Sequence, residues 1–365
     1  MKEISEIVTP THDDLCVSSI VPAVVGGRST QLVSDEVVRA KSVVLLVVDG
    51  MGWNQVQERK EELPFLRTAS MSPISTVAPS TTATALTSIC TGVPPGEHGV
   101  VGYKIPVAAG LLNCLRWTSG SRSLTNEVPP VDFQPVEPFL GTSPSVVTRA
   151  EFRNSGFTQA HLRGGEFCAW WSPATLVTEV IEQVNLGRPF VYAYYDGLDK
   201  VAHVYGLGAH YLDELRFVDA LIERIAEQLP EGSVLLVTSD HGMVEVGDNL
   251  ISLDDELVLR TSNTSGEARF LWLHAKDREA YSLLDTAQSL ADVAWVASVE
   301  QILDERWFGA VVTPEARSRM GDIAVVAKED IALLDPRSPD SPNLVARHGS
   351  MTANEMLVPF IEVIT

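Results

Sequence analysis

Several residue types and patterns are scarce in this sequence, and each scarcity excludes a class of protein or a kind of site. The four cysteines are scattered through 365 residues without a CxxC pair, so neither a disulfide framework nor a cysteine-rich zinc site is predicted. No apolar run approaches the roughly 20 residues of a membrane span. Acids and a proline occupy the N-terminus, where a secretory signal needs an apolar segment. We therefore expect a cytoplasmic protein with reduced thiols and no membrane partner.

Positively charged residues are also in short supply. The chain has 27 lysines and arginines against 48 acidic residues, which gives a formal net charge of −21. Binding to nucleic acid or to an anionic membrane surface needs clustered positive charge, so neither is expected. A small phosphate ester held by metal ions remains compatible with this charge, because bound cations dominate the local field. The expected partner is such a small molecule, and the sequence leaves the oligomeric state open.

Three aliphatic segments predict the strands of a buried sheet. They are VVLLVV at 43–48, FVYAYY at 190–195 and SVLLVT at 233–238. Runs without alternating polar positions are typical of parallel strands covered by helices on both faces. Helical patterns follow at about 53–69, where Pro64 breaks the pattern, and at 79–92, 173–186 and 211–229. We predict an α/β fold with a mostly parallel central sheet sandwiched by helices.

The chain is expected to form one domain over residues 1–365. Residues 101–185 are rich in proline and less regular, and we interpret them as loops and strands that form a cap or insertion at the active-site edge. Apolar segments at 269–274 and 324–327 predict a further portion of sheet between about 245 and 345.

Polar side chains of the metal-binding type follow each of the three buried strands. They are Asp49 after the first strand, Asp199 and His203 after the second, Asp240 and His241 after the third, and His348 in a late loop. The carboxyl ends of parallel strands meet at one edge of the sheet, where ligands bind in open α/β folds. This mixed set of oxygen and nitrogen donors suits zinc or a similar divalent ion.

A hydroxyl group in the segment Ser80-Thr81-Thr82 is the candidate nucleophile. The segment precedes a predicted helix, so its hydroxyl groups would lie near unpaired backbone N–H groups and the positive end of the helix dipole. A metal ion bound to such an oxygen would lower its pKa. The alternative interpretation is that the cluster only caps the helix.

Five motifs resemble those of the alkaline phosphatase superfamily, and most of all its nucleotide pyrophosphatase/phosphodiesterase branch. They are LVVDGMG, the threonine segment that ends in CTGVPPGEHGVVGY, YDGLDKVAHVYG, TSDHGM and RHGSMTANEMLVPFI, in the family's order over about residues 43 to 360. The resemblance implies two divalent ions, usually zinc. One would be held by Asp49, Asp240 and His241 with the nucleophile, and the other by Asp199, His203 and His348.

The resemblance also implies which residues contact the phosphate. Counting back from Thr91-Gly92 places the nucleophile at Thr82, which would also bind metal, and Thr81 is the adjacent alternative. In the phosphodiesterase branch an asparagine follows HG-x-x-G and donates to a phosphate oxygen, but this chain has Tyr103 there. The hydroxyl of Tyr103 or the amide of Asn113 are the two candidates for this contact.

These features predict a two-metal hydrolase that cleaves a phosphodiester or pyrophosphate bond of a nucleotide-like substrate through a phospho-threonine intermediate. Two ions roughly 3.5 to 4 Å apart would clamp the phosphoryl group. A phosphomonoesterase is the main alternative, since Arg116 and Arg163 offer positive charge for a dianion. A phosphonate hydrolase of the same superfamily and a metal-binding member without turnover are the others.

Overall fold

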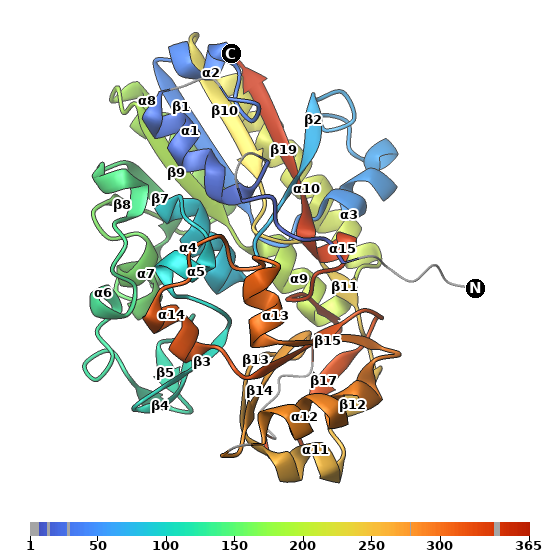
Figure 1. Ribbon diagram of the computed structural model, residues 1–365. Helices are drawn as coiled ribbons and strands as arrows, with labels where there is room; N and C mark the ends of the chain where they lie inside the picture. The colour runs from blue at the N-terminus through green and yellow to red at the C-terminus, as the bar shows by residue number, and fades with distance from the viewer. Residues whose placement is uncertain (1–6, 13–14, 28–29, 278, 339–343) are drawn as a thin grey trace.

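A seven-stranded sheet forms the centre of the protein (Figure 1). The computed structural model describes residues 7–12, 15–27, 30–277, 279–338 and 344–365. The strand order is β2 (Met71–Ser75), β19 (Leu357–Ile364), β10 (Ser233–Thr238), β1 (Ser42–Val48), β9 (Phe190–Tyr195), β7 (Ser145–Arg149) and β8 (Glu166–Trp170). All neighbours from β10 to β8 pair in parallel, and β19 runs antiparallel to both of its neighbours. The prediction of an α/β fold with a mostly parallel central sheet is confirmed.

The register of the three innermost strands makes them end level. Val47 of β1 pairs with Thr238 of β10, and Val48 of β1 pairs with Tyr195 of β9. The residues that follow these strands therefore emerge side by side at the carboxyl edge.

Helices cover both faces of this sheet, as continuous aliphatic strands require. Side chains of β1 at 43, 45 and 47 pack with α1 (Ile20–Gly26) and α4 (Thr82–Thr91), and those at 44, 46 and 48 face α3 (Trp53–Glu58), α8 (Pro173–Asn185), α9 (Gly197–Tyr205) and α10 (Ala209–Gln228). Shorter helical segments of the first half are η1 (Val17–Ser19), α2 (Asp35–Arg39), η2 (Lys60–Glu62), α5 (Pro95–His98), α6 (Pro130–Phe133), η3 (Pro138–Gly141), η4 (Ala150–Phe152) and α7 (Gly156–His161).

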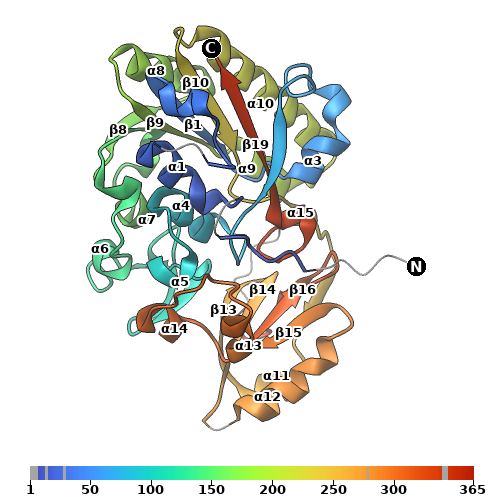
Figure 2. The same cartoon turned by 45° about the horizontal axis from the view of Figure 1, so that its top comes forward.

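A second, antiparallel sheet lies below the carboxyl edge of the central sheet (Figures 1 and 2). Its order is β15 (Ala294–Ser298), β16 (Ile323–Ala327), β14 (Phe270–Ala275), β13 (Thr261–Glu267), β3 (Lys104–Val107), β4 (Gly110–Asn113), β5 (Thr118–Ser119) and β6 (Arg122–Ser123). It is flanked by α11 (Asp255–Arg260), α12 (Ala280–Ala287), η5 (Gln288–Leu290), α13 (Val299–Asp304) and α14 (Pro314–Arg319). Two small ladders pair β11 (Val244–Glu245) with β18 (Ala346–Arg347), and β12 (Leu250–Ser252) with β17 (Ala332–Leu334).

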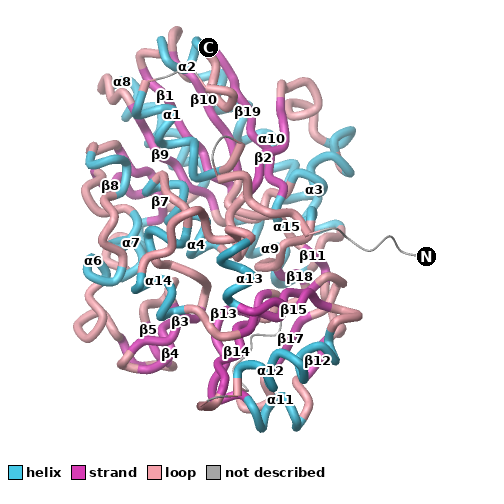
Figure 3. The backbone as a smooth tube through the Cα atoms, in the orientation of Figure 1, coloured by secondary structure: helices cyan, strands magenta, loops and turns pink. Residues whose placement is uncertain are grey.

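The second sheet joins segments that are distant in sequence. Residues 104–123 and 261–327 share it, whereas residues 145–170 belong to the central sheet, so the segment 101–185 is divided between the two (Figure 3). The further sheet expected between 245 and 345 is present. The single domain over 1–365, and a cap at 101–185, stay predictions.

The helical pattern over 53–69, expected to break at Pro64, gives an α-helix that ends before that proline. It ends at Glu58 as an α-helix, and a 3-10 turn follows at Lys60–Glu62. Pro64 cannot donate a backbone hydrogen bond and disfavours helix before it, so the apolar spacing continues through turns. Within the described ranges, no helix combines the length and apolar composition needed to cross a bilayer.

Candidate functional site

The ligand-type side chains that follow β1, β9 and β10 converge at the level ends of these strands. Asp49 follows β1 and is 3% exposed, and Asp240 and His241 follow β10 and are fully buried. Asp199 and His203 lie on α9, directly after β9. His348 reaches the same place from the loop after β18. The structure thus brings together all six ligand residues expected from the sequence.

Asp49, Asp240 and His241 form one cluster. His241 Nε2 lies 3.3 Å from Asp49 Oδ1 and 3.5 Å from Asp240 Oδ2. Backbone N–H groups hold the other Asp240 oxygen, since Gly50 N and His241 N donate to Oδ1 over 3.2 and 3.1 Å. The hydroxyl of Tyr194 donates to Asp49 Oδ2. One oxygen of each carboxylate is therefore fixed by the protein, and the other faces the cluster.

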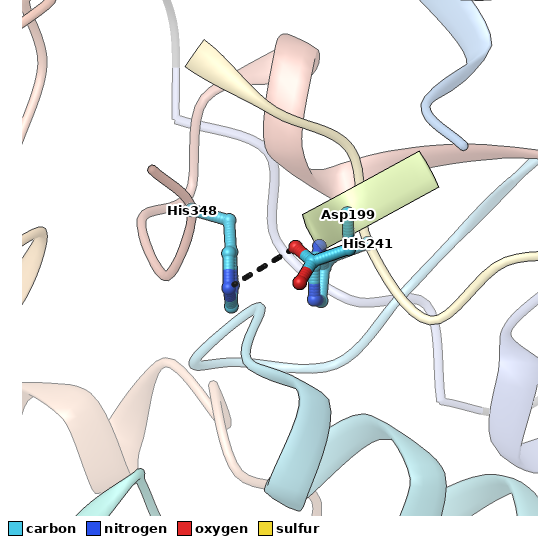
Figure 4. A group of neighbouring side chains, drawn as sticks. All are labelled: Asp199, His241 and His348. Carbon is cyan, nitrogen blue, oxygen red and sulfur yellow. Dashed lines mark ion pairs between the residues drawn. The ribbon is translucent and has the colours of Figure 1, made fainter. Parts of the chain in front are cut away.

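Asp199, His203 and His348 lie beside this cluster. Asp199 Oδ1 is 3.3 Å from His203 Nε2 and 3.9 Å from His348 Nε2. The His348 ring stacks on the His241 ring, with centroids 3.5 Å apart and an angle of 7° between planes. Figure 4 shows these two rings facing one another with the Asp199 carboxylate beside them. His241 is close enough to both sets to serve either of two neighbouring ions.

Backbone carbonyl groups orient all three imidazoles. The Nδ1 atoms of His203, His241 and His348 lie 2.8, 3.1 and 2.9 Å from the carbonyl oxygens of Ala346, Gly242 and Ser80. A carbonyl oxygen can only accept, so each Nδ1 carries the proton and each Nε2 presents a lone pair to the cluster. This arrangement is typical of histidines that bind metal.

The donor set fits divalent cations. Asp49 Oδ1, Asp199 Oδ1 and Asp240 Oδ2 are buried without a hydrogen-bond partner among the described residues. Burial and the neighbouring Asp240 and Asp199 raise the pKa of Asp49 well above its usual range, while burial and two neighbouring imidazoles lower the pKa of His348. A bound cation would satisfy the oxygens and stabilise the ionised carboxylates.

Thr82 is the hydroxyl residue that faces this cluster. It begins α4, and its Oγ1 lies 3.0 Å from His241 Nε2. Thr81 occupies the N-cap position but makes no capping hydrogen bond with its side chain. Ser80 Oγ donates to Ser350 O over 2.6 Å. The geometry therefore places Thr82, and neither of its two neighbours, beside the side chain of His241 in this cluster.

A cavity of about 510 Å³ opens between the two sheets at this cluster. Its lining includes Thr82 and the ligand-type residues, together with leucine and phenylalanine side chains from α4, β4 and α7, namely Leu86, Leu111 and Phe157. Tyr103 lines the cavity, and Asn113 Nδ2 donates to its hydroxyl oxygen over 2.6 Å. Because this oxygen accepts from Asn113, the Tyr103 proton is free to point elsewhere.

The two arginines considered for a phosphate dianion differ in position. Arg116 lines the cavity, together with Lys104, Lys200 and Arg347. Arg163 is absent from its lining, and its guanidinium donates to the carbonyl oxygens of Ala160 and Val136.

A buried ion pair outside the ligand cluster fixes the His348 loop. Arg269 and Glu355 are both fully buried, and Arg269 Nε and Nη2 each donate to a Glu355 oxygen over 2.7 Å. Glu355, on α15 (Ala353–Met356), also accepts from Ser350 N over 3.0 Å. Ser350 O in turn accepts from Ser80, whose own carbonyl holds His348. The pair thus links the second sheet to the loop that carries His348.

Sequence reasoning did not identify Tyr194, Arg269, Glu355 or Glu267, which lines the cavity from the second sheet. For Tyr194 a signal was available. Successive side chains of a strand point to opposite faces of the sheet. In β9, Val191, Ala193 and Tyr195 face α8, α9 and α10, so Tyr192 and Tyr194 face α4. For the other three residues no local pattern marks a role.

Comparison with known proteins gives a family match and several structural neighbours. The model of the family type I phosphodiesterase / nucleotide pyrophosphatase matches residues 43–351. Murine ectonucleotide pyrophosphatase/phosphodiesterase 5 shares the fold with a TM-score of 0.66 and 18% identity, over 89% of this chain and 88% of the other. An inactive variant of the murine protein in complex with AMP gives a TM-score of 0.65 and 17% identity, over 88% and 87%.

A phosphonoacetate hydrolase shares the fold to a similar degree. The enzyme from Sinorhizobium meliloti, in complex with phosphonoformate, gives a TM-score of 0.67 and 16% identity, over 89% of this chain and 91% of the other. At such identities these likenesses show a common fold. No curated protein sequence matches the chain.

Proposed function

Since the chain belongs to the type I phosphodiesterase / nucleotide pyrophosphatase family of the alkaline phosphatase superfamily, we propose that it is a metal-dependent hydrolase of phosphodiester or pyrophosphate bonds. Thr82 is the nucleophile, and the substrate is a nucleotide-like phosphate ester, as the AMP complex of the murine neighbour suggests. The observation that carries this proposal is the Thr82 hydroxyl, 3.0 Å from His241 in a cluster of buried, partnerless carboxylate oxygens.

The ligand residues divide into two sets in the proposed site. Asp49, Asp240 and His241 would hold one divalent ion with Thr82, and Asp199, His203 and His348 would hold a second, most readily zinc. When bound, such ions lower the pKa of a hydroxyl group and neutralise charge on the phosphoryl group. The cavity beside them has room for the ester group that leaves.

The reaction has two displacement steps. Thr82 Oγ1 attacks phosphorus in line, releasing its hydroxyl proton to solvent and forming a P–O bond as the bond to the leaving oxygen breaks. The N-terminus of α4 faces the negative charge that develops there. Water then attacks the phospho-threonine, breaks its bond to Thr82 and restores the hydroxyl proton. Asp49 is held by Tyr194, and the imidazoles are held by carbonyl groups, so the site is oriented before substrate binds.

The first experiment measures metal content, and hydrolysis of bis(p-nitrophenyl) phosphate and p-nitrophenyl phosphate, each with and without chelator. We expect bound zinc and faster, chelator-sensitive cleavage of the diester. Thr82→Ala should abolish turnover while the ions stay bound, and Thr81→Ala should retain it. Unchanged turnover in Thr82→Ala, or its loss only in Thr81→Ala, would refute the nucleophile assignment.

A phosphonate hydrolase is the second candidate, because Lys104 and Arg116 line the cavity and offer charge for a carboxylate on the substrate. Release of phosphate from phosphonoacetate, faster than from either nitrophenyl ester, would favour it. Faster cleavage of the monoester would favour a phosphomonoesterase, for which Arg116 is placed and Arg163 is not. Bound metal with no hydrolysis would favour a non-catalytic member.

A further inference from the structure

His161 is an imidazole in the cavity wall that belongs to neither ligand set. It is the last residue of α7, is 3% exposed and lines the cavity together with Phe157 and Leu162. Its ring stacks on the ring of Phe157, with centroids 3.9 Å apart and an angle of 22° between planes. The ring is therefore held in one orientation by its own helix.

The two nitrogens of this ring differ in their hydrogen bonding. Nδ1 lies 2.7 Å from the carbonyl oxygen of Phe157. A carbonyl oxygen can only accept, so Nδ1 carries the proton. Burial lowers the pKa of His161 to about 4, so the imidazole is neutral at pH 7. Nε2 consequently presents a lone pair.

This Nε2 atom is an acceptor that faces the cavity. No described residue makes a hydrogen bond with it, and it is not among the atoms sealed from accessible space, in contrast to Asp49 Oδ1 and Asp240 Oδ2. Because His161 is otherwise buried and lines the cavity, the surface that Nε2 retains belongs to that cavity. The Nδ1 bond closes the last turn of α7, but it leaves the free acceptor unexplained.

The wall around His161 is apolar. Leu86, Phe157 and Leu162 belong to one core cluster, and all three line the cavity. Leu86 lies one helical turn after Thr82 on the same face of α4, so this apolar part adjoins the proposed nucleophile. A phenylalanine in place of His161 would pack there without an acceptor to satisfy. An unpaired acceptor in an apolar wall favours a ligand that donates, because any other ligand leaves it without a partner.

We propose that His161 is a specificity-determining residue whose Nε2 accepts a hydrogen bond from an uncharged amino or hydroxyl group on an apolar substituent of the phosphate ester. The inference rests on the proposed function and names the substrate class of the same site. The apolar wall binds the body of the substituent, and His161 selects for its donor.

Arylphosphonates that differ in one donor test this assignment by binding alone, since the aryl group is a poor leaving group. Aminophenylphosphonate and aminobiphenylphosphonate place an uncharged aromatic amine at two distances from phosphorus. A methyl group replaces the amine in the methylphenyl and methylbiphenyl counterparts. In calorimetry on the zinc-loaded protein, at least one amino ligand should bind roughly 2- to 10-fold more tightly than its methyl counterpart, as expected for one net hydrogen bond.

Substitutions of His161 separate the acceptor from the packing. His161→Phe keeps a ring and removes the acceptor, so the preference for the amino ligand should disappear. His161→Gln offers an amide oxygen near the place of Nε2 and should retain part of it. His210→Phe is the matched control and should keep the full preference, because His210 is exposed, stacks on Tyr205 and is absent from the cavity lining. Zinc content and urea unfolding identify any misfolded variant.

Three results would overturn the assignment. They are no binding of any of the four phosphonates, no preference for either amino ligand in the unaltered protein, and a preference that His161→Phe retains. The proposed function can fail separately. If the unaltered protein binds the phosphonates but hydrolyses neither nitrophenyl ester, the ligand pairs still decide the role of His161.

Discussion

The buried ion pair of Arg269 and Glu355 offers a sharp test of how the second sheet supports the site. Both side chains are fully buried, and two N–H···O contacts of 2.7 Å join them. Arg269 Nη1 also donates to the carbonyl oxygens of Glu329 and Ile331 over 2.8 and 2.7 Å. Removing either partner leaves an uncompensated charge in the interior.

Such a loss typically costs about 3 to 5 kcal/mol in the free energy of unfolding. With an unfolding entropy of roughly 2.1 cal/mol/K per residue, this corresponds to a drop of about 5 °C in Tm for a chain of this length. We expect that cost for Arg269→Met and for Glu355→Gln. The double variant should lose at least about 2 kcal/mol less than the two single losses together, because neither charge is then left alone.

Denaturant unfolding of the four proteins measures this coupling, and zinc titration against a chromophoric chelator measures its effect on the site. Because Glu355 holds the loop of His348 through Ser350, the single variants should bind zinc about 10- to 100-fold more weakly, as for other residues that orient ligands. Arg39→Met, in an exposed pair with Asp35, is the control and should change stability by less than about 1 kcal/mol.

The assigned coupling would be refuted if the stability lost in the double variant equalled the sum of the losses in the two single variants. Lower stability with unchanged zinc affinity would show that the pair stabilises the fold without orienting His348.

Two further predictions concern pH and ligand orientation. Burial lowers the pKa of His161 to about 4. In the unfolded chain the imidazole takes up its proton near pH 6.5, so protonation favours unfolding. The free energy of unfolding should therefore fall by about 2 to 3 kcal/mol as the pH drops from 7.5 to 4.5. Urea unfolding should show a weaker pH dependence in His161→Phe, and an equal dependence would contradict the assignment. Tyr194→Phe removes the hydroxyl bonded to Asp49 and should weaken zinc binding about 10- to 100-fold in the same chelator titration. Tyr195 lies on the opposite face and its hydroxyl donates to Glu214, so Tyr195→Phe should leave zinc binding unchanged. Equal zinc affinities in the two variants would argue against a role for Tyr194.

Much of the candidate site can be predicted from the sequence because its residues follow directly after strands. Each aliphatic run of β1, β9 and β10 must be buried, and the ligand-type residue that follows must leave the sheet at the same edge. The positions of Asp49, Asp199 and Asp240 follow from this rule together with the parallel pairing. The motif order and the helix at Thr82 are local features of the same kind.

The remaining parts depend on contacts between segments far apart in the chain. Glu267 reaches the cavity because β13 pairs with β14 and β3 beneath the central sheet, and Arg269 meets Glu355 across 86 residues. Asn113 donates to Tyr103 because β3 and β4 turn back on one another. An antiparallel sheet that joins residues 104–123 to 261–327 follows from no spacing within either segment, since its register is set by packing and long-range pairing. The sequence by itself determined which ligand-type side chains and which threonine segment meet at the strand ends, whereas the wall of the cavity opposite them was decided only by the tertiary structure.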